Sequence, residues 1–182
     1  MGCYTENFHV ITGYTALFRS ADGYVKFVTY YSSKVMATYL LTWNPGKWAW
    51  EDLAESSRKV KSGKSVSICW SCGNTKKIQE GDRVFILRQG IEPKGICASG
   101  IVTEGSFEDI NWVGHLSQYI ECEFDTLLNP ETDKILPRYI LSEPPFSGVH
   151  WNTQRSGISI PDAIAVELEK LWALFSNQYG RL

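Results

Sequence analysis

The 182-residue chain lacks any run of the roughly 20 apolar residues that a membrane-spanning helix needs. Its N-terminus also lacks a charged start followed by an apolar core, which is the pattern of a secretory signal. These two absences argue against a helical membrane protein and a secreted one. We therefore expect a cytoplasmic protein with no membrane partner.

Cysteine and histidine are scarce. The five cysteines are Cys3, Cys69, Cys72, Cys97 and Cys122, and the three histidines are His9, His115 and His150. An odd number of cysteines argues against a disulfide framework. Cys69 and Cys72 form a Cys-x-x-Cys pair, but a structural zinc site needs a second ligand pair at comparable spacing, and the histidines are isolated. The sequence therefore predicts free thiols, with no metal and no cofactor.

Motifs for catalysis are also missing. Gly63-Lys64-Ser65 resembles the end of a phosphate-binding loop, but Arg58 stands where that motif requires a glycine. The carboxylates of Glu121, Glu123 and Asp125 have the period of a strand face and could bind Mg²⁺. Their alternation with apolar residues is equally what a half-buried strand requires. We expect no catalytic residues, and keep a small Mg²⁺-dependent nuclease as an alternative.

The net charge of −2 is unevenly distributed. Residues 58 to 94 contain nine basic and three acidic residues, a local charge of +6 that leaves −8 for the rest of the chain. Such a basic region predicts a side that faces phosphates, although a solvated face without a partner has the same composition. The candidate phosphate-binding residues are Lys59, Lys61, Lys64, Lys76, Lys77, Arg88 and Lys94.

Two regions differ in character. We expect residues 1–35 to be an N-terminal extension: an appended hairpin turning at Asp22-Gly23, a poorly ordered segment, or the result of a start codon assigned upstream of Met36. Residues 36–182 form the domain proper. Strands are expected at 38–43, 65–70, 83–88, 96–103 and 119–127, with helices near 50–62 and after Ser159, its candidate cap. The fold class is α+β, a mixed β-barrel of about five to six strands with flanking helices. Trp172 of the last helix is assigned to the core.

Aromatic residues are abundant, with seven tryptophans, and one of them stands in an unusual setting. Trp70 ends a predicted strand and is followed by short hydrogen-bonding residues, Ser71, Cys72, Gly73 and Asn74. A flat ring beside such groups suits a pocket that stacks on a planar ligand and reads its edge, as for an extruded nucleobase. Trp70 could also plug one end of the barrel.

Together these motifs resemble the EVE domains of the PUA-like superfamily, in particular the EVE-like N-terminal domain of bacterial HNH-type modification-dependent restriction endonucleases. The resemblance covers residues 36–175. The matching motifs are Thr42-Trp43-Asn44-Pro45 with Trp48 and Trp50, Cys69-Trp70-Ser71-Cys72-Gly73-Asn74, Gly81-Asp82-Arg83-Val84-Phe85, Pro93-Lys94-Gly95-Ile96, Phe124-Asp125, Ile135-Leu136-Pro137-Arg138, and His150-Trp151-Asn152 through Ser156-Gly157-Ile158. A looser likeness, through Tyr39 to Asn44, Trp70-Ser71 and Trp112, is to YTH domains, which read methylated adenine.

The resemblance implies a PUA-like reader that flips a methylated or hydroxymethylated base, such as 5-methylcytosine in double-stranded DNA, into an aromatic cage. The implied pocket residues are Trp43, Asn44, Trp70, Ser71, Cys72, Asn74 and Trp112. Because the sequence has no His-Asn-His cluster, cleavage would come from a nuclease partner in a restriction-modification system. A non-catalytic accessory protein of a defence system is a further alternative. On this basis Trp70→Ala is expected to abolish binding and leave the fold intact.

Overall fold

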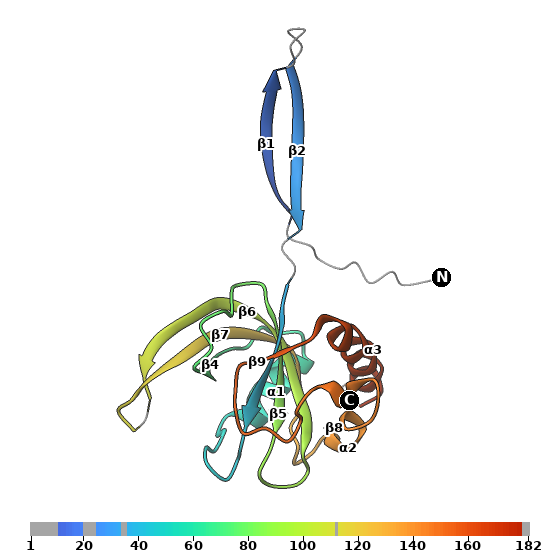
Figure 1. The fold of residues 1–182 in the computed structure, drawn as a ribbon. Helices are drawn as coiled ribbons and strands as arrows, with labels where there is room; N and C mark the ends of the chain where they lie inside the picture. Colours follow the sequence, from blue (N-terminus) through green and yellow to red (C-terminus); the bar gives the residue numbers. More distant parts are fainter. Residues whose placement is uncertain (1–10, 20–24, 34–35, 112, 180–182) are drawn as a thin grey trace. The chain divides into compact units, whose positions relative to one another are not determined.

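The computed structural model describes residues 11–19, 25–33, 36–111 and 113–179. The chain divides into two compact units, Met1–Met36 and Ala37–Leu182. In the first, β1 (Ile11–Arg19) pairs antiparallel with β2 (Val25–Ser33) (Figure 1). The predicted turn at Asp22-Gly23 lies outside the described residues.

The second unit contains a seven-stranded sheet (Figure 1). Its strands are β3 (Thr38–Trp43), β4 (Ser67–Gly73), β5 (Arg83–Arg88), β6 (Gly95–Ile110), β7 (Leu116–Leu127), β8 (Leu136–Pro137) and β9 (Ile158–Ile160). The order is β4-β7-β6-β5-β3-β9, with β8 paired to β6. β3 and β5 run parallel, and the other neighbouring pairs are antiparallel.

The α+β class is confirmed, but a closed barrel is not seen. In the described part of the chain the ladder pairs β3 with β5 and β9, and β4 with β7, so no ladder joins β3 to β4. The helices are α1 (Leu53–Lys61), the one-turn α2 (Arg138–Leu141), a 3₁₀ turn (Phe146–Gly148) and α3 (Asp162–Tyr179). No helix among the described residues is long and apolar enough to cross a membrane.

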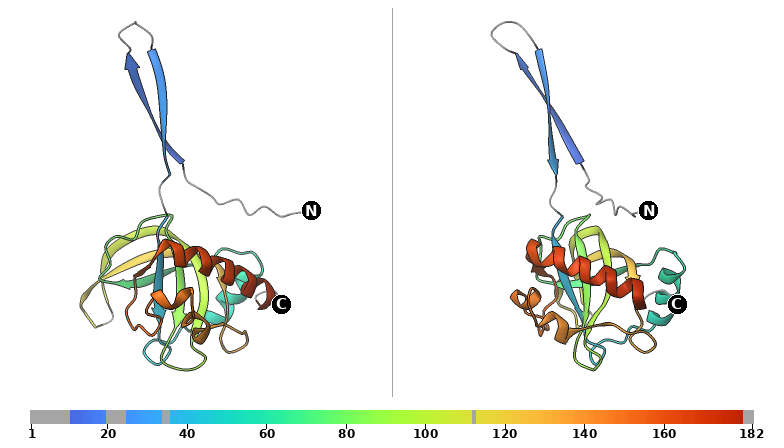
Figure 2. Two further views of the ribbon diagram at one scale, coloured as in Figure 1. Left: turned by 45° about the vertical axis from the view of Figure 1, so that its right-hand side comes forward. Right: turned by 90° about the vertical axis from the view of Figure 1, so that its right-hand side faces the viewer.

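The core forms around β5, whose residues 84–87 are all fully buried. Such continuous burial is expected of a strand covered on both faces. α3 runs across the strands (Figure 2), and the indole of its Trp172 meets the Phe85 ring edge-on at 6.1 Å. Trp172 Nε1 also donates a hydrogen bond to Ser99 Oγ at 2.7 Å. With 2% of its surface exposed, Trp172 is confirmed as a core residue.

The start of the last helix differs from the prediction. Ser159 lies in β9, opposite Tyr39 of β3, and α3 begins at Asp162. Pro161 ends the short strand and precedes the helix, as its missing N–H allows. The predicted Ser159 cap is therefore wrong, because the edge of the sheet takes this residue before the helix starts.

Candidate nucleic-acid interface

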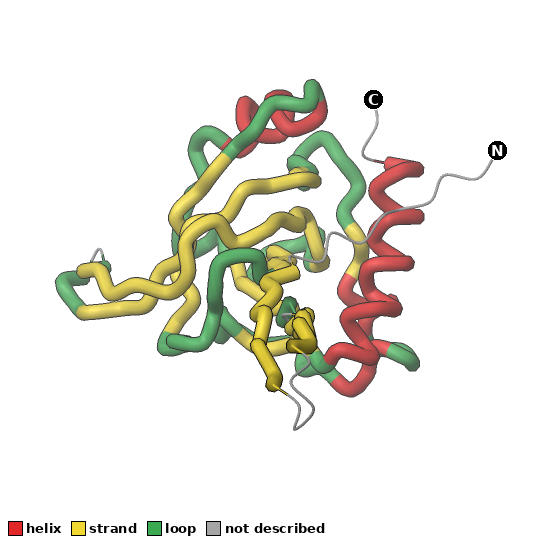
Figure 3. The backbone as a smooth tube through the Cα atoms, turned by 90° about the horizontal axis from the view of Figure 1, so that it is seen from above, coloured by secondary structure: helices red, strands yellow, loops and turns green. Residues whose placement is uncertain are grey.

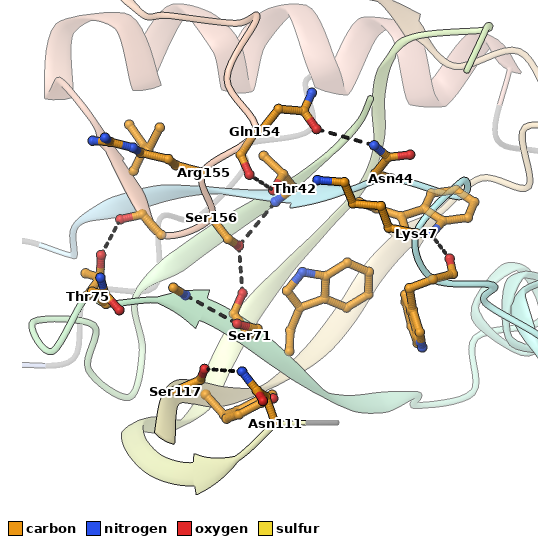
Figure 4. A pocket seen from close by; sticks show the side chains of 18 of the residues that line it. Thr42, Asn44, Lys47, Ser71, Thr75, Asn111, Ser117, Gln154, Arg155 and Ser156 are labelled. Carbon is orange, nitrogen blue, oxygen red and sulfur yellow. Dashed lines mark hydrogen bonds between the residues drawn. The ribbon is translucent and has the colours of Figure 1, made fainter. Parts of the chain in front are cut away.

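A cavity of about 960 Å³ opens beside the unjoined strands β3 and β4. Its walls come from the end of β3 and the following loop, from β4, from residues 154–158, and from the outer part of the β6–β7 hairpin. Figure 4 shows Thr42, Ser71 and Ser156 together at the centre of this arrangement. Four segments far apart in the sequence thus meet around one opening.

Residues 154–157 fill the gap between β3 and β4. The Ser156 hydroxyl accepts a hydrogen bond from Thr42 N (3.3 Å) and donates one to Ser71 O (2.6 Å), so it bridges the two strands (Figure 4). Gly157 N donates to Leu40 O (2.9 Å), and Thr75 Oγ1 donates to Gly157 O (2.8 Å). These hydrogen bonds connect β3 to β4 where no strand ladder does, and they fix the position of residues 154–157 at the cavity.

Three tryptophans that line the cavity, Trp43, Trp48 and Trp70, form an aromatic wall. The Trp48 ring lies edge-to-face with Trp70 at 5.3 Å, and Trp50 stands behind them, 5.0 Å from Trp70 and 5.6 Å from Trp43. Trp43 and Trp70 are 6% and 5% exposed, whereas Trp48 is 46% exposed. Trp43 Nε1 donates to Trp48 O at 3.0 Å and fixes the loop. Trp48 also stacks on Trp50 at 5.9 Å, and it is the most exposed ring of this wall, although sequence reasoning did not select it for the pocket.

Trp70 lines the cavity mainly as a buried support for Trp48. Trp70 also belongs to the hydrophobic core. The same side chain therefore contributes both to the wall of the cavity and to the packing of the fold. Truncating a buried tryptophan leaves a large void and costs roughly 3–5 kcal/mol. We therefore expect Trp70→Ala to lower the stability of the fold as well as to alter the cavity, so binding by this variant does not test the pocket alone.

Polar groups surround the aromatic wall. The Asn44 side chain accepts a hydrogen bond from Gly46 N (3.0 Å) and donates one to Gln154 Oε1 (3.3 Å) at the surface (Figure 4). Ser71 and the exposed Asn74 also line the cavity. On the hairpin side, Asn111 Nδ2 donates to Ser117 Oγ at 3.0 Å. Hydrogen-bonding atoms thus lie on both sides of the aromatic rings.

Two of the predicted pocket residues, Cys72 and Trp112, are not among the residues that line the cavity. Cys72 is fully buried and does not line the cavity, and its burial raises the pKa of the thiol to about 11. The alternation of β4 places Cys72 on the inner face with Trp70, and the exposed Cys69 lines the cavity instead. Cys72 as a ligand contact is therefore wrong. Trp112 lies outside the described residues.

None of the seven predicted phosphate-binding residues, all of which the structure describes, lines the cavity. Four of them form ion pairs: Lys59 with Glu55, Lys61 with Asp133, Lys76 with Glu108, and Lys94 with Glu92. Lys64 and Lys77 are exposed. A basic stretch of sequence is divided among a helix, strands and loops that face different ways, so it does not form one basic wall.

Arg88 in particular has a structural role. It is 8% exposed, its Nη1 donates to the carbonyl oxygens of Ile91 and Pro93, and its guanidinium lies over the Trp43 ring at 5.5 Å. The cations that do line the cavity are Lys47 and Arg155 (Figure 4). Lys47 follows the Asn44-Pro45-Gly46 turn, but no sequence signal linked it to Arg155, 108 positions away.

The carboxylates of the nuclease alternative do not form a metal site. Glu121, Glu123 and Asp125 are exposed on β7, and no three metal-ligating side chains gather anywhere in the described ranges. Asp125 instead accepts hydrogen bonds from Arg83 and Ser99. Burial alone lowers the pKa of the Arg83 guanidinium, but Asp125 and Glu169 outweigh it and hold that pKa above its ordinary value.

Comparison with known proteins identifies a shared fold. No family model matches the sequence, and no curated protein is similar enough in sequence to count as a relative. Among solved structures, a hypothetical protein from Leishmania major is similar at a TM-score of 0.55 and 13% identity, covering 77% of this chain and 96% of the other. A protein from Rhodopseudomonas palustris has a TM-score of 0.53 and 15% identity, with coverages of 76% and 94%. The fold is one that these proteins share.

A looser likeness is to human THYN1 in complex with DNA that contains 5-methylcytosine. The TM-score is 0.46 at 11% identity, covering 74% of this chain and 96% of that one. A likeness at this level says nothing about what the present chain binds.

Proposed function

We propose that this chain is a PUA-like, EVE-type module that binds a modified base of DNA, extruded from the duplex, in the cavity beside β3 and β4. The observation that carries the proposal is the half-exposed Trp48 ring at a cavity edged by amide and hydroxyl groups. Its volume of about 960 Å³ lies within the range of roughly 300–1,000 Å³ typical of ligand pockets. A flat heterocycle satisfies both the ring face and the polar edge.

The energetics require more than stacking. A base stacked on an aromatic ring gains roughly 1–3 kcal/mol, while extrusion costs a few kcal/mol. The ammonium of Lys47 and the guanidinium of Arg155 line the same opening and would contact the phosphates beside the extruded nucleotide. These two cations replace the longer basic stretch expected from the sequence.

Recognition of the base edge is assigned to Asn44, Ser71 and Asn74, which line the cavity. The Asn44–Gln154 hydrogen bond is exposed and 3.3 Å long, so exchanging it for a base atom costs little. A methyl or hydroxymethyl group on the base would add apolar contact with the tryptophan wall. In this proposal the chain reads the base, and a nuclease partner cuts the DNA.

The test is a fluorescence-anisotropy panel at fixed salt. Short duplexes carry one cytosine, 5-methylcytosine, 5-hydroxymethylcytosine, adenine or N6-methyladenine at a single site. We expect one modified base to bind best, and Trp48→Ala to weaken that binding about 10- to 100-fold because a stacking face is lost. The matched control is Tyr139→Ala, which removes a 72% exposed ring that does not line this cavity.

Equal binding of all five duplexes, or an unchanged preference in the Trp48 variant, would contradict the proposal. Tighter binding of a single-stranded RNA of the same sequence would retain the pocket and change its ligand. Lys47→Gln with Arg155→Gln is expected to weaken every duplex alike and to reduce the salt dependence of binding, because phosphates carry no sequence information.

A further inference from the structure

A second cavity, of about 860 Å³, shares no lining residue with the first cavity beside β3 and β4. Its walls come from the β5–β6 loop, from the segment that runs from residue 133 through β8 into α2, and from the C-terminal end of α3. Figure 3 shows α3 and the outer part of the β6–β7 hairpin, which lines the first cavity, on opposite sides of the sheet. Substitutions can therefore alter either cavity separately.

The side chain of Arg138, at the start of α2, is fixed at this cavity by neutral partners. Its Nη1 donates to Gln89 Oε1 (3.1 Å) and to Asn152 Oδ1 (2.6 Å). Gln89 is 1% exposed, and its Nε2 donates to Trp151 O at 2.6 Å, so this acceptor is itself held in place. In the part of the chain that the structure describes, Arg138 has no carboxylate partner, and its Nε and Nη2 donate no hydrogen bond. An oriented guanidinium with an unused edge suits a phosphate group, which it can bind through two parallel hydrogen bonds.

Lys94 stands beside Arg138 at the same cavity. Arg138 N donates to Lys94 O at 2.9 Å, next to the paired ends of β6 and β8. The exposed Glu92 carboxylate accepts a hydrogen bond from Lys94 N (2.8 Å) and lies 3.3 Å from Lys94 Nζ. The amide of Lys94, and then the charges of Lys94 and Arg138, hold the pKa of Glu92 below its ordinary value. A carboxylate of the chain thus already interacts with both cations, and an external anion can replace it.

The lining of the second cavity carries an excess of positive charge. Three cations and two carboxylates line it: Lys94, Lys134, Arg138, Glu92 and Asp133. Asp133 is paired at 2.7 Å with Lys61, which does not line the cavity, so that carboxylate is already neutralised. Three cations against the one remaining carboxylate leave an excess of two positive charges. A phosphate monoester carries about −1.5 to −2 charges at pH 7, which matches this excess.

Aromatic rings line the same cavity. Phe175 and Tyr179 of α3 have ring centroids 4.9 Å apart, and the Lys134 ammonium lies 4.9 Å from the centroid of Tyr179. Tyr139, the chain neighbour of Arg138, is 72% exposed. A ligand whose phosphate meets Arg138 can therefore place a flat ring against Tyr139, since a heterocycle stacks well on an aromatic side chain.

We propose that the second cavity binds a nucleoside monophosphate, with its phosphate at Lys94 and Arg138 and its base against Tyr139. This is a site of its own and goes beyond the proposed function of the first cavity. Its volume lies within the roughly 300–1,000 Å³ typical of small-ligand pockets. An acidic peptide would also meet the cations, but its charges are spread along its length, whereas these cations and the exposed ring lie around one cavity. The observations therefore favour the nucleotide.

The experiment titrates the full chain with the four ribonucleoside 5′-monophosphates by isothermal calorimetry, with the nucleosides and inorganic phosphate as partial ligands. We expect at least one monophosphate to bind about tenfold or more tightly than its nucleoside or inorganic phosphate, because both ends of the ligand contribute. Arg138→Gln should weaken this binding about tenfold or more. Tyr139→Ala should weaken it about fivefold or more and leave inorganic phosphate unaffected. Glu92→Gln should strengthen it, because the competing carboxylate is gone.

The matched control is Lys64→Gln, which removes an exposed lysine that lines neither cavity and should change nothing. The opposite effects expected at Glu92 and Arg138 separate a binding role from a loss of folding, because Glu92→Gln alters only an exposed loop residue. If no monophosphate binds more tightly than inorganic phosphate, or if neither variant changes the affinity, the proposal is overturned.

Three further outcomes distinguish the two cavities and the two kinds of ligand. Monophosphate binding that is lost in Trp48→Ala and kept in Arg138→Gln would place the nucleotide in the first cavity and overturn the proposal. Tighter binding of a glutamate-rich peptide than of every monophosphate would also overturn it and make the cavity a peptide site. Duplex binding in the anisotropy panel should be unchanged in Glu92→Gln, so either proposal can fail while the other stands.

Discussion

The centre of the sheet and the walls of the cavity are held together by different forces. At the centre, β5, the inner part of β6 and α3 enclose fully buried apolar side chains such as Phe85 and Ile86. At the cavity, single polar side chains set the geometry: Ser156 bridges β3 and β4, which no ladder joins, and Asn111 shapes the turn of the β6–β7 hairpin. The first region supplies stability. The second supplies an adjustable surface, since an exposed hydrogen bond such as Asn44–Gln154 can be exchanged for one to a ligand.

The largest expected effect breaks the packed centre. Trp172→Ala should lower the free energy of unfolding by roughly 3–5 kcal/mol, because it removes a buried ring and leaves Ser99 Oγ without the indole donor. Leu174→Ala on the same helix removes a side chain that is 73% exposed, and should change stability by less than about 0.5 kcal/mol. Urea unfolding monitored by circular dichroism measures both. Similar values for the two variants would show that α3 does not pack as described.

A smaller effect is expected at the strand bridge. Gly157 has φ +78°, and a Cβ there would lie 2.3 Å from Cys72 O; Gly63 has φ +76° and nothing within 4 Å of such a Cβ. Both alanine variants carry the strain of a positive φ, but only Gly157→Ala forces β4 to move. Gly157→Ala should therefore be the less stable of the two by about 1–3 kcal/mol in urea unfolding, and should also weaken oligonucleotide binding. Equal losses would show that the bridge does not hold the cavity.

The smallest effect concerns the thiol in the cavity wall. Partial burial, together with the carboxylates of Glu121 and Asp109, raises the pKa of Cys69 above its ordinary value. A raised pKa lowers the thiolate fraction at pH 8, so alkylation by iodoacetamide should be slower than for a free thiol and should keep rising at more alkaline pH. Glu121→Gln should lower the pKa and speed alkylation at pH 8, whereas Glu123→Gln should not. Mass spectrometry of the Cys69 peptide measures the rate.

A bound oligonucleotide provides the counter-check on the same thiol. Because Cys69 lines the cavity, the best-binding duplex should slow its alkylation, while an unmodified duplex should not. Equal alkylation with and without the preferred duplex would place the ligand elsewhere on the molecule.

Much of the sheet could be predicted from alternation. In β7, residues 120, 122 and 124 are buried while 121, 123 and 125 are exposed, as the sequence indicated. The α1 helix was predicted from the residues that start and end it, and the core position of Trp172 from helical spacing. The short strands β8 and β9 were missed, because two or three residues carry no readable period and pair only where a longer strand offers them an edge.

The cavity was predicted only in part. Trp43, Asn44, Trp70, Ser71 and Asn74 line it, whereas Cys72 lies on the same face of β4 as Trp70 but is fully buried and does not line it. Trp48, Lys47 and Arg155 were missed as pocket residues. The basic stretch from residue 58 to 94 gave a wrong prediction of the cavity's cations, because residues close in sequence need not be close in space. Ion pairs such as Lys61–Asp133 also neutralise part of its charge away from the cavity.

The sequence by itself determined what depends on neighbours along the chain: the buried faces of the strands, the helices, and an abundance of tryptophan beside small polar residues. Only the tertiary structure decided which tryptophan remains open and which cations face it, and that a second group of cations lines another cavity. The physical reason is that the spacing of apolar and polar residues along the chain indicates which side chains are buried and which face water. A binding surface is made by side chains from distant segments, whose meeting depends on how the sheet folds back and what fills the gap between its strands.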